Sequence, residues 1–288
     1  REIALKKGFK VNEYGIFRLD DDKRIGGEKE EEIYETLGME WIPPEMREDQ
    51  GEIELAQEKK LPVLIDISDL QGDLHVHSNW SDGVSSIAEM AEAALSRGYK
   101  YLAICDHTQS LAVASGLSPE EIRERRKEIE QWNKKGKGLR LLDGVEANIM
   151  SDGSLDFPDS ELEKLEVVVA GLHSGLGQGE EKILYRLEGA MKNKYVQVIS
   201  HPTGRILNRR DAYQVNREKL FNLAQETNTY LEINSQPERL DLSDGDARRA
   251  RDLGVKLVIS TDAHDPSSLD YIRYGVAQAR RGWLQKED

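Results

Sequence analysis

The stretch that decides the fold reads GDLHVHSNWSDG and covers residues 72–83. It begins as a short apolar run in which His75 and His77 alternate with Leu74 and Val76. Because residues two apart on a strand point to the same side, we expect the histidines to face inward while the two apolar side chains pack against outer helices. The stretch therefore predicts a strand with candidate functional side chains at its carboxyl end.

Six further apolar runs of about strand length follow, each rich in Val, Ile, Leu or Tyr. Helical patterns lie between most of them, and two have clear starts, at Ser86 with Glu89 three residues later and at Pro119. Such an alternation predicts an α/β fold with parallel strands, either an open doubly wound sheet or a closed (β/α) barrel. The predicted strands are 72–77, 100–105, 139–146, 166–172, 196–200, 229–234 and 256–261, and the clearest helices are 85–97, 118–135 and 243–253.

All six histidines of the chain lie at or just after the ends of these runs, together with three acids. Imidazole and carboxylate are the ligands of borderline divalent cations such as zinc and manganese. A lone histidine in such a place is more often an ordinary core or surface residue, but nine donors at strand ends favour a metal cluster. A closed barrel brings these ends together, whereas an open sheet does not. The candidate ligands are His75, His77, Asp82, His107, Glu146, His173, His201, Asp262 and His264.

The stretches GDLHVHSNWSDG, ICDHT, GVEANI, AGLHS, ISHPTG and STDAH resemble the PHP domain, named for polymerases and histidinol phosphatases, over about residues 70–283. The resemblance implies a distorted seven-stranded (β/α) barrel with three divalent metal ions, Mn²⁺ and/or Zn²⁺, with iron also possible. In several relatives a histidine stands at the position of Asp82, which leaves the preference of the third site open. The implied sites are His75, His77, Glu146 and Asp262 for the first ion, Glu146 as a bridge with His173 and His201 for the second, and Asp82, His107 and His264 for the third.

Other polar residues near the strand ends have expected roles around these ions. Asp73 and Asp106 are placed where they would orient a ligand imidazole, although ordinary strand-end carboxylates explain them equally well. Glu232 and Asn234 end a strand without a histidine and are expected to line the mouth. The substrate-contacting candidates are Arg205, Arg209 and Arg210 in the loop HPTGRILNRR, with a solvated charge cluster as the alternative.

The first seventy residues form a second region. Residues 11–17 (VNEYGIF) predict a short strand, 20–23 a polar turn and 28–37 a charged helix. The segments KKGFKVNEYGIFRL and EEEIYETLGMEWIPPEMRED are similar to the end of the thumb of family X DNA polymerases, whose bacterial and archaeal members carry a PHP domain directly after it. We therefore expect a small α+β thumb-like segment at 1–47, a linker at 48–69 and a metallohydrolase domain at 70–288.

The two resemblances together imply a function. They imply a metal-dependent phosphodiesterase that acts as a 3′-5′ exonuclease in DNA repair, with AP-site or 3′-phosphate processing as related activities. Bound metals lower the pKa of water to about 7, so no side-chain nucleophile is required, and Glu146 and His107 are the expected catalytic residues. The expected partners are DNA 3′ ends, gapped or abasic DNA, and the palm and fingers domains of a polymerase. The chain itself holds no palm carboxylate set, so we expect that it does not extend DNA.

Two other functions fit the barrel. One is a small-molecule phosphomonoesterase of the histidinol phosphatase type, against which the thumb-like segment argues. The other is a non-catalytic module in which metals brace the barrel, a role that would not need all nine ligands.

Composition restricts these possibilities only partly. The net charge of −14 argues against a nucleic-acid partner, but divalent ions at the mouth would reverse the local potential. The chain has no apolar run of about eighteen residues and no signal-like start, so we expect a cytoplasmic protein that neither enters membranes nor is secreted. Cys105 is the only cysteine, and its apolar surroundings predict a core residue.

Overall fold

The computed structural model describes residues 1–288 and divides the chain into two compact units, Arg1–Val63 and Leu64–Asp288. The first unit contains a three-stranded antiparallel sheet in the order β1-β2-β3, with short helices before and after it. Its elements are α1 (Glu2–Lys6), β1 (Phe9–Asn12), β2 (Gly15–Arg18), β3 (Arg24–Gly26), α2 (Glu30–Thr36), the 3₁₀ helix η1 (Pro44–Met46) and α3 (Glu52–Glu58).

The predicted single strand at 11–17 is wrong, because this segment is a hairpin. Val11 pairs with Ile16 across a tight turn in which the Asn12 side chain accepts a hydrogen bond from the Tyr14 amide at 3.0 Å. Gly15 follows with φ of +132°, and a Cβ there would lie 2.3 Å from the Gly26 carbonyl oxygen. An alternating apolar pattern looks the same in one strand as in two short paired strands, and the glycine was the missed signal.

The predicted helix and turn of this region are confirmed, whereas the expected linker contains helices. The predicted helix at 28–37 is α2, and the predicted turn at 20–23 separates β2 from β3. The segment 48–69, expected as a linker, contains α3 and the 3₁₀ helix η2 (Ile67–Asp69). The acidic start of α3 suits a helix amino terminus, a signal hidden by the high charge of the whole segment.

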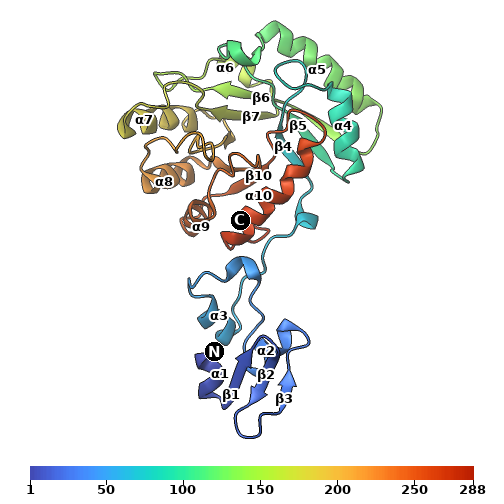
Figure 1. The fold of residues 1–288 in the computed structure, drawn as a ribbon. Coiled ribbons are helices and arrows are strands. Elements are labelled where there is room, and N and C mark those ends of the chain that lie inside the picture. Colours follow the sequence, from blue (N-terminus) through green and yellow to red (C-terminus); the bar gives the residue numbers. More distant parts are fainter. The chain divides into compact units, whose positions relative to one another are not determined.

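The second unit is a barrel of seven parallel strands in chain order, with helices outside it (Figure 1). The prediction of a distorted seven-stranded (β/α) barrel is confirmed. The strands are β4 (Gly72–Val76), β5 (Tyr101–Ile104), β6 (Arg140–Asn148), β7 (Val167–Gly171), β8 (Val198–Ile199), β9 (Tyr230–Asn234) and β10 (Leu257–Ser260). The helices are α4 (Ile87–Ser96), α5 (Pro119–Lys134), α6 (Asp159–Leu162), α7 (Glu180–Met191), α8 (Arg217–Thr227), α9 (Asp244–Asp252) and α10 (Ile272–Arg281), with 3₁₀ helices η3 (Ala112–Ala114) and η4 (Ser268–Tyr271).

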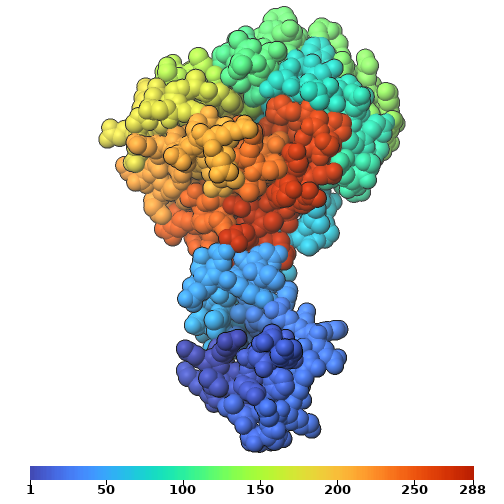
Figure 2. Space-filling view, viewed as in Figure 1, coloured from blue at the N-terminus to red at the C-terminus, as the bar shows by residue number.

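The barrel closes between its first and last strands, but only at the carboxyl end. Val76 and Ala263 form an isolated parallel bridge, and the His77 amide donates to the Ala263 carbonyl at 2.8 Å. On the surface Arg97, which ends α4, pairs with Asp270 of η4 at 2.8 Å. The red carboxy-terminal segment accordingly lies beside the teal segment in Figure 2. Closure at this end draws the strand ends that carry the candidate ligands into one ring.

The strands have an apolar outer face and a divided interior. Outward side chains such as Val76 and Leu102 pack with residues of α4 and α5. Beneath the ligands, a small apolar cluster consists of Ala103, Cys105, Val167, Val169 and Val198. Leu74 packs against this inner cluster, so the expectation that it faces the outer helices is wrong; the ladder between β4 and β5 shifts register between Asp73 and Val76 and breaks the simple alternation.

The predicted helix starts are confirmed. The Ser86 hydroxyl accepts from the Glu89 amide at 3.3 Å while the Glu89 carboxylate accepts from the Ser86 amide at 2.8 Å. Ser118 and Glu121 form the same reciprocal pair at α5, with Pro119 as its first residue. None of the helices has the length and apolar character that crossing a bilayer requires.

Candidate metal centre

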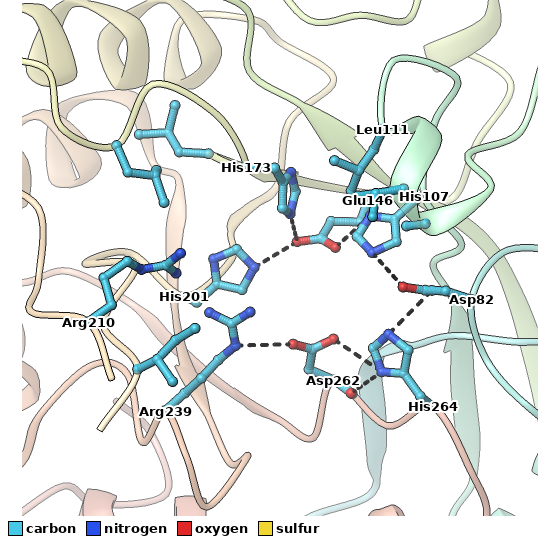
Figure 3. A pocket seen from close by; sticks show the side chains of 15 residues that line it. Asp82, His107, Leu111, Glu146, His173, His201, Arg210, Arg239, Asp262 and His264 are labelled. Atoms are coloured by element: carbon cyan, nitrogen blue, oxygen red, sulfur yellow. Dashed lines mark hydrogen bonds and ion pairs between the residues drawn. The ribbon is translucent and has the colours of Figure 1, made fainter. Parts of the chain in front are cut away.

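The candidate ligands lie together at the carboxyl ends of the barrel strands. Each of β4 to β8 and β10 supplies at least one of them, from its last residues or from the loop that follows. Seven of the nine line a pocket of about 330 Å³ (Figure 3), and the other two, His75 and His77, are buried. The seven are Asp82, His107, Glu146, His173, His201, Asp262 and His264.

Glu146 of β6 occupies the centre of this arrangement. Its Oε1 lies 3.2 Å from His173 Nε2 and 3.0 Å from His201 Nε2. Its Oε2 lies 3.1 Å from His107 Nδ1 and 3.5 Å from His75 Nε2. Each carboxylate oxygen thus lies within 3.5 Å of two imidazoles, an arrangement in which the carboxylate could bind a cation through each oxygen.

Two acids from other strands face the remaining imidazoles. Asp262 Oδ1 lies 3.1 Å from His77 Nε2. Asp82 lies 3.3 Å from His264 Nε2 through Oδ1 and 3.6 Å from His107 Nε2 through Oδ2. Ligand side chains thus surround the mouth of the barrel on both sides of Glu146.

The donor atoms fall into three groups, within each of which all atoms lie within 4.8 Å of one another. These groups share His77 and His107, whereas the family resemblance assigns each of these histidines to one ion. His201 is not in a group, although it reaches Glu146 directly. The groups are His75, His77 and Asp262; His107, Glu146 and His173; and His77, Asp82, His107 and His264.

The residues present fit divalent cations. His77 Nδ1, His107 Nδ1 and His173 Nε2 are buried and have no hydrogen-bond partner. Each of these nitrogens has a carboxylate oxygen within 3.7 Å but no hydrogen bond to it, and a buried polar atom without a hydrogen bond costs about 1–3 kcal/mol. Imidazole and carboxylate donors suit zinc, manganese and iron, and cations between the imidazoles and the carboxylates would give these nitrogens partners.

Hydrogen bonds from behind hold several of the rings. Glu232 accepts from His75 Nδ1 at 2.7 Å, and its other oxygen accepts from the His201 amide at 2.6 Å. His173 Nδ1 meets the Asn148 side-chain oxygen at 3.2 Å. The contacts of His75 and His173 occupy Nδ1 and leave Nε2 towards Glu146, which is the usual way that proteins orient metal-binding histidines. Glu232 was expected at the mouth in general terms, whereas Asn148 was not singled out from the sequence.

The predicted role of Asp73 and Asp106 as imidazole partners is wrong. Asp73 accepts from the Thr261 hydroxyl at 2.5 Å and from the His75 amide at 3.0 Å. Asp106 accepts from the Ser78 amide at 2.7 Å and pairs with the buried Arg125 at 3.0 Å. Both carboxylates therefore brace the backbone of the strand ends, because their side chains point away from the rings.

The electrostatics of the ring favour ionised acids. Burial opposes ionisation of Glu146, but the surrounding imidazoles hold its pKa well below the usual range. Burial likewise opposes ionisation of Asp82, yet the hydrogen bond with His264 and the nearby His77 and His107 lower its pKa to about 2. Burial lowers the pKa of His107 to about 3 against the pull of Glu146. Ionised carboxylates and a neutral imidazole are the protonation states that bind metals.

Two of the candidate ligands have strained backbones. His201 has φ of +29° and Asp262 has φ of +53°. Residues other than glycine adopt such values at a cost of order 1–3 kcal/mol each, and such residues concentrate at functional sites. The surrounding hydrogen bonds therefore hold both side chains in place against a local preference.

The three predicted phosphate-binding arginines differ in position. Arg210 lines the pocket, whereas Arg205 donates to the Arg239 carbonyl at 2.9 Å and braces a loop. Arg209 is exposed and pairs with Glu238 at 3.4 Å. Arg239, not singled out from the sequence, lines the pocket and lies 3.8 Å from Asp262. Figure 3 shows Arg210 and Arg239 on the side of the pocket opposite Asp82.

The fold and the site define a (β/α) barrel protein with a histidine and carboxylate metal centre at its mouth. The family described as PHP domain matches residues 73–236, and the family described as DNA polymerase beta thumb matches residues 1–48. The chain belongs to the PHP domain family, and a thumb of the family X polymerase type precedes its barrel.

Known proteins resemble all or part of the chain. The chain is 43% identical over its whole length to the DNA polymerase/3′-5′ exonuclease PolX of Bacillus subtilis (strain 168), of which it spans 50%. A probable phosphatase of Thermoanaerobacter sp. (strain X514) is 30% identical over 67% of this chain and 78% of that protein. A solved histidinol phosphate phosphatase of Lactococcus lactis, complexed with zinc, L-histidinol and phosphate, has a TM-score of 0.55 at 16% identity over 73% of this chain and 93% of its own. This last similarity shows the fold.

Proposed function

We propose that this chain is a metal-dependent phosphoesterase that removes nucleotides from DNA 3′ ends, as the 3′-5′ exonuclease part of a family X DNA polymerase. The observation that carries the proposal is the central position of Glu146, whose two oxygens face four imidazoles beside two arginines. The thumb at residues 1–48 supports DNA as the substrate. The name of the Bacillus subtilis relative supports the exonuclease activity.

The nine donors would hold two or three divalent ions, with Mn²⁺ and Zn²⁺ as the candidates. Such ions lower the pKa of a bound water and neutralise charge on a phosphate. Glu146 would bridge neighbouring ions, and His107 would bind beside it. The same pocket is suited to 3′-phosphate or AP-site processing in repair, and the palm and fingers domains of the polymerase are the proposed partners.

The chain's own side chains have a separate task in this reaction. Arg210 and Arg239 lie where their guanidinium groups would hold the non-bridging oxygens of the phosphate, which is a geometry that arginine favours. No cysteine nucleophile competes, because Cys105 is buried in the apolar inner cluster and burial raises the pKa of its thiol to about 12. Substrate orientation by the arginines and water activation at the centre are therefore separate functions within one pocket.

The proposal is tested with the chain loaded with Mn²⁺ and offered 5′-labelled single-stranded and gapped DNA. We expect stepwise loss of 3′ nucleotides by the wild type and by Glu188→Ala, a surface control on α7, but not by Glu146→Ala. Absence of nucleotide release from the wild type would contradict the proposal. Rapid hydrolysis of simple phosphate monoesters without any action on DNA would instead support the phosphomonoesterase, and metal stabilisation without turnover of either would support the bracing role.

A further inference from the structure

We infer that an apolar rim of the metal pocket contacts the base of the nucleotide whose phosphate is hydrolysed. The apolar rim consists of Leu111, Val113, Leu176 and Ile206. The inference rests on the proposed function and adds to it a binding surface for the nucleobase.

The apolar rim comes from three neighbouring loops of the barrel. Leu111 and Val113 follow His107 after β5, Leu176 follows His173 after β7, and Ile206 follows His201 after β8. Two of these loops follow β5 and β7, the neighbours of β6, which carries Glu146, and the third follows the next strand, β8. The apolar rim therefore comes from the loops after β5, β7 and β8, whereas Asp82, Asp262 and His264 follow β4 and β10.

The loop that carries Leu111 and Val113 is held firmly. Its ends pair through a bridge between Thr108 and Leu117, and Asp156 accepts from the Thr108 hydroxyl at 2.6 Å and from the Ser110 amide at 2.9 Å. A Cβ on Gly116 would lie 2.0 Å from the Thr108 carbonyl oxygen, so this close approach requires glycine. A loop fixed in this way presents a defined surface.

The apex of this loop has an apolar side chain with no role in folding. Val113 is 91% exposed, the highest value among the large apolar residues of the chain. Its side chain contributes almost nothing to the core, yet it lines a pocket whose floor is strongly polar. Binding pockets combine apolar walls with a few polar groups in this manner.

The same pocket carries cationic groups that complement the apolar rim. Arg210 and Arg239 lie across the pocket from Leu111 in Figure 3. Ile206 and Arg210 also pair with each other in one turn, with the Ile206 amide donating to the Arg210 carbonyl at 2.8 Å. Leu111 thus faces the two guanidinium groups, while Ile206 lies beside one of them. Apolar side chains and guanidinium groups around one pocket fit a ligand that has a flat apolar body and an anionic group, as a nucleotide has.

The size and chemistry of the pocket limit how the base is recognised. About 330 Å³ is near the lower end of ligand pockets, which suits one nucleotide and not a duplex. Aliphatic side chains contact the face of any base but form no hydrogen bonds with its edges, so the apolar rim should strengthen binding without selecting a base.

A double-mutant cycle between the protein and the DNA tests this inference. The protein change is Leu111→Ser with Val113→Ser, and the DNA change replaces the 3′-terminal nucleotide with a residue that has the sugar and phosphate but no base. With Mn²⁺ present, we expect removal of the base to lower kcat/KM of the wild type about 10-fold, mainly through KM. The variant should show the same low value for both DNAs. Ile67→Ser, a change at another exposed apolar residue just before β4, should behave as the wild type.

The outcomes separate the two proposals. Suppose that the wild type processes both DNAs. If the variant then lowers kcat/KM by the same factor for each DNA, or leaves both values unchanged, the apolar rim does not contact the base. If the wild type processes neither DNA, the proposed exonuclease function fails. Unchanged far-ultraviolet circular dichroism and an unchanged Mn²⁺-induced rise in Tm would show that the variant retains the fold and the metal centre.

Discussion

The two ends of the barrel interior differ although the same strands build both. At the amino end, Ala103 of β5 and Val169 of β7 pack in an apolar cluster. Four residues after Ala103 and Val169 in the sequence, His107 and His173 face Glu146. The amino end gains stability by excluding water, whereas the mouth buries acids and imidazoles that need partners. The difference teaches that stability and function are separated along the barrel axis, and the predictions below test that separation.

The largest effect is expected from the central carboxylate. Glu146→Gln removes the charge that faces four imidazoles, and loss of even outer partners of metal ligands typically costs 10–100-fold. We therefore expect kcat/KM for nucleotide release with Mn²⁺ to fall by at least about 1,000-fold. Glu188→Gln on the surface of α7 should leave it unchanged. A fall of less than tenfold would show that the mouth does not depend on this residue.

Removal of metal should destabilise the barrel itself. A ligand present at 1,000 times its Kd stabilises the native state by about 4 kcal/mol, which corresponds to a change in Tm of roughly 10 °C for a domain of this size. Scanning calorimetry with Mn²⁺ and with excess chelator should show this difference for the barrel transition. It should persist in Cys105→Ala and shrink in Glu146→Gln. An identical Tm with and without metal would argue that no cation binds the native mouth.

A smaller effect is expected from the carboxylate behind the ring. Glu232→Gln disturbs the contact with His75 Nδ1, and we expect metal affinity to fall by roughly 10–100-fold. Titration calorimetry with Mn²⁺ measures this change. Partial recovery of nucleotide release at high Mn²⁺ would identify Glu232 as a positioning residue. If affinity were unchanged while activity fell, its role would instead lie in the substrate complex.

The smallest effect is expected at the apolar end. Cys105→Ala removes a buried sulfur from the inner cluster and should lower the free energy of unfolding by about 1 kcal/mol. Nucleotide release at a temperature well below Tm should stay within about twofold of wild type. Denaturant unfolding and the exonuclease assay measure the two quantities separately. Loss of activity with unchanged stability would show that the thiol contributes to the reaction. It would contradict the separation of stability and function between the two ends.

Much of the fold could be predicted because its signals are local. The seven strands, the helix starts at Ser86 and Pro119 and the confinement of histidines to strand ends follow from short patterns. The hairpin around Gly15 and the helix α3 were missed, because alternation does not distinguish one strand from two and high charge hides a short helix.

The candidate site could be predicted less completely. Its nine donors were evident as residue types at strand ends, and the structure brings all of them to one mouth. Arg239 is distant from every histidine along the sequence, and no pattern in the residues around it predicts that it lies beside Asp262. Arg205 and Arg209 have the expected charge but other partners. Arg205 donates to the Arg239 carbonyl, and Arg209 pairs with Glu238.

The sequence by itself determined the order of strands and helices, the placement of imidazoles and carboxylates at strand ends, and the likeness to a thumb followed by a PHP domain. Only the tertiary structure decided which donors face one another, that Glu146 lies at the centre, and that Glu232 holds His75 from 157 positions away. The physical reason is that periodicity and residue type act over a few neighbouring residues. Distances across the mouth depend on strand register and on closure between Val76 and Ala263, which arise only when the whole barrel packs.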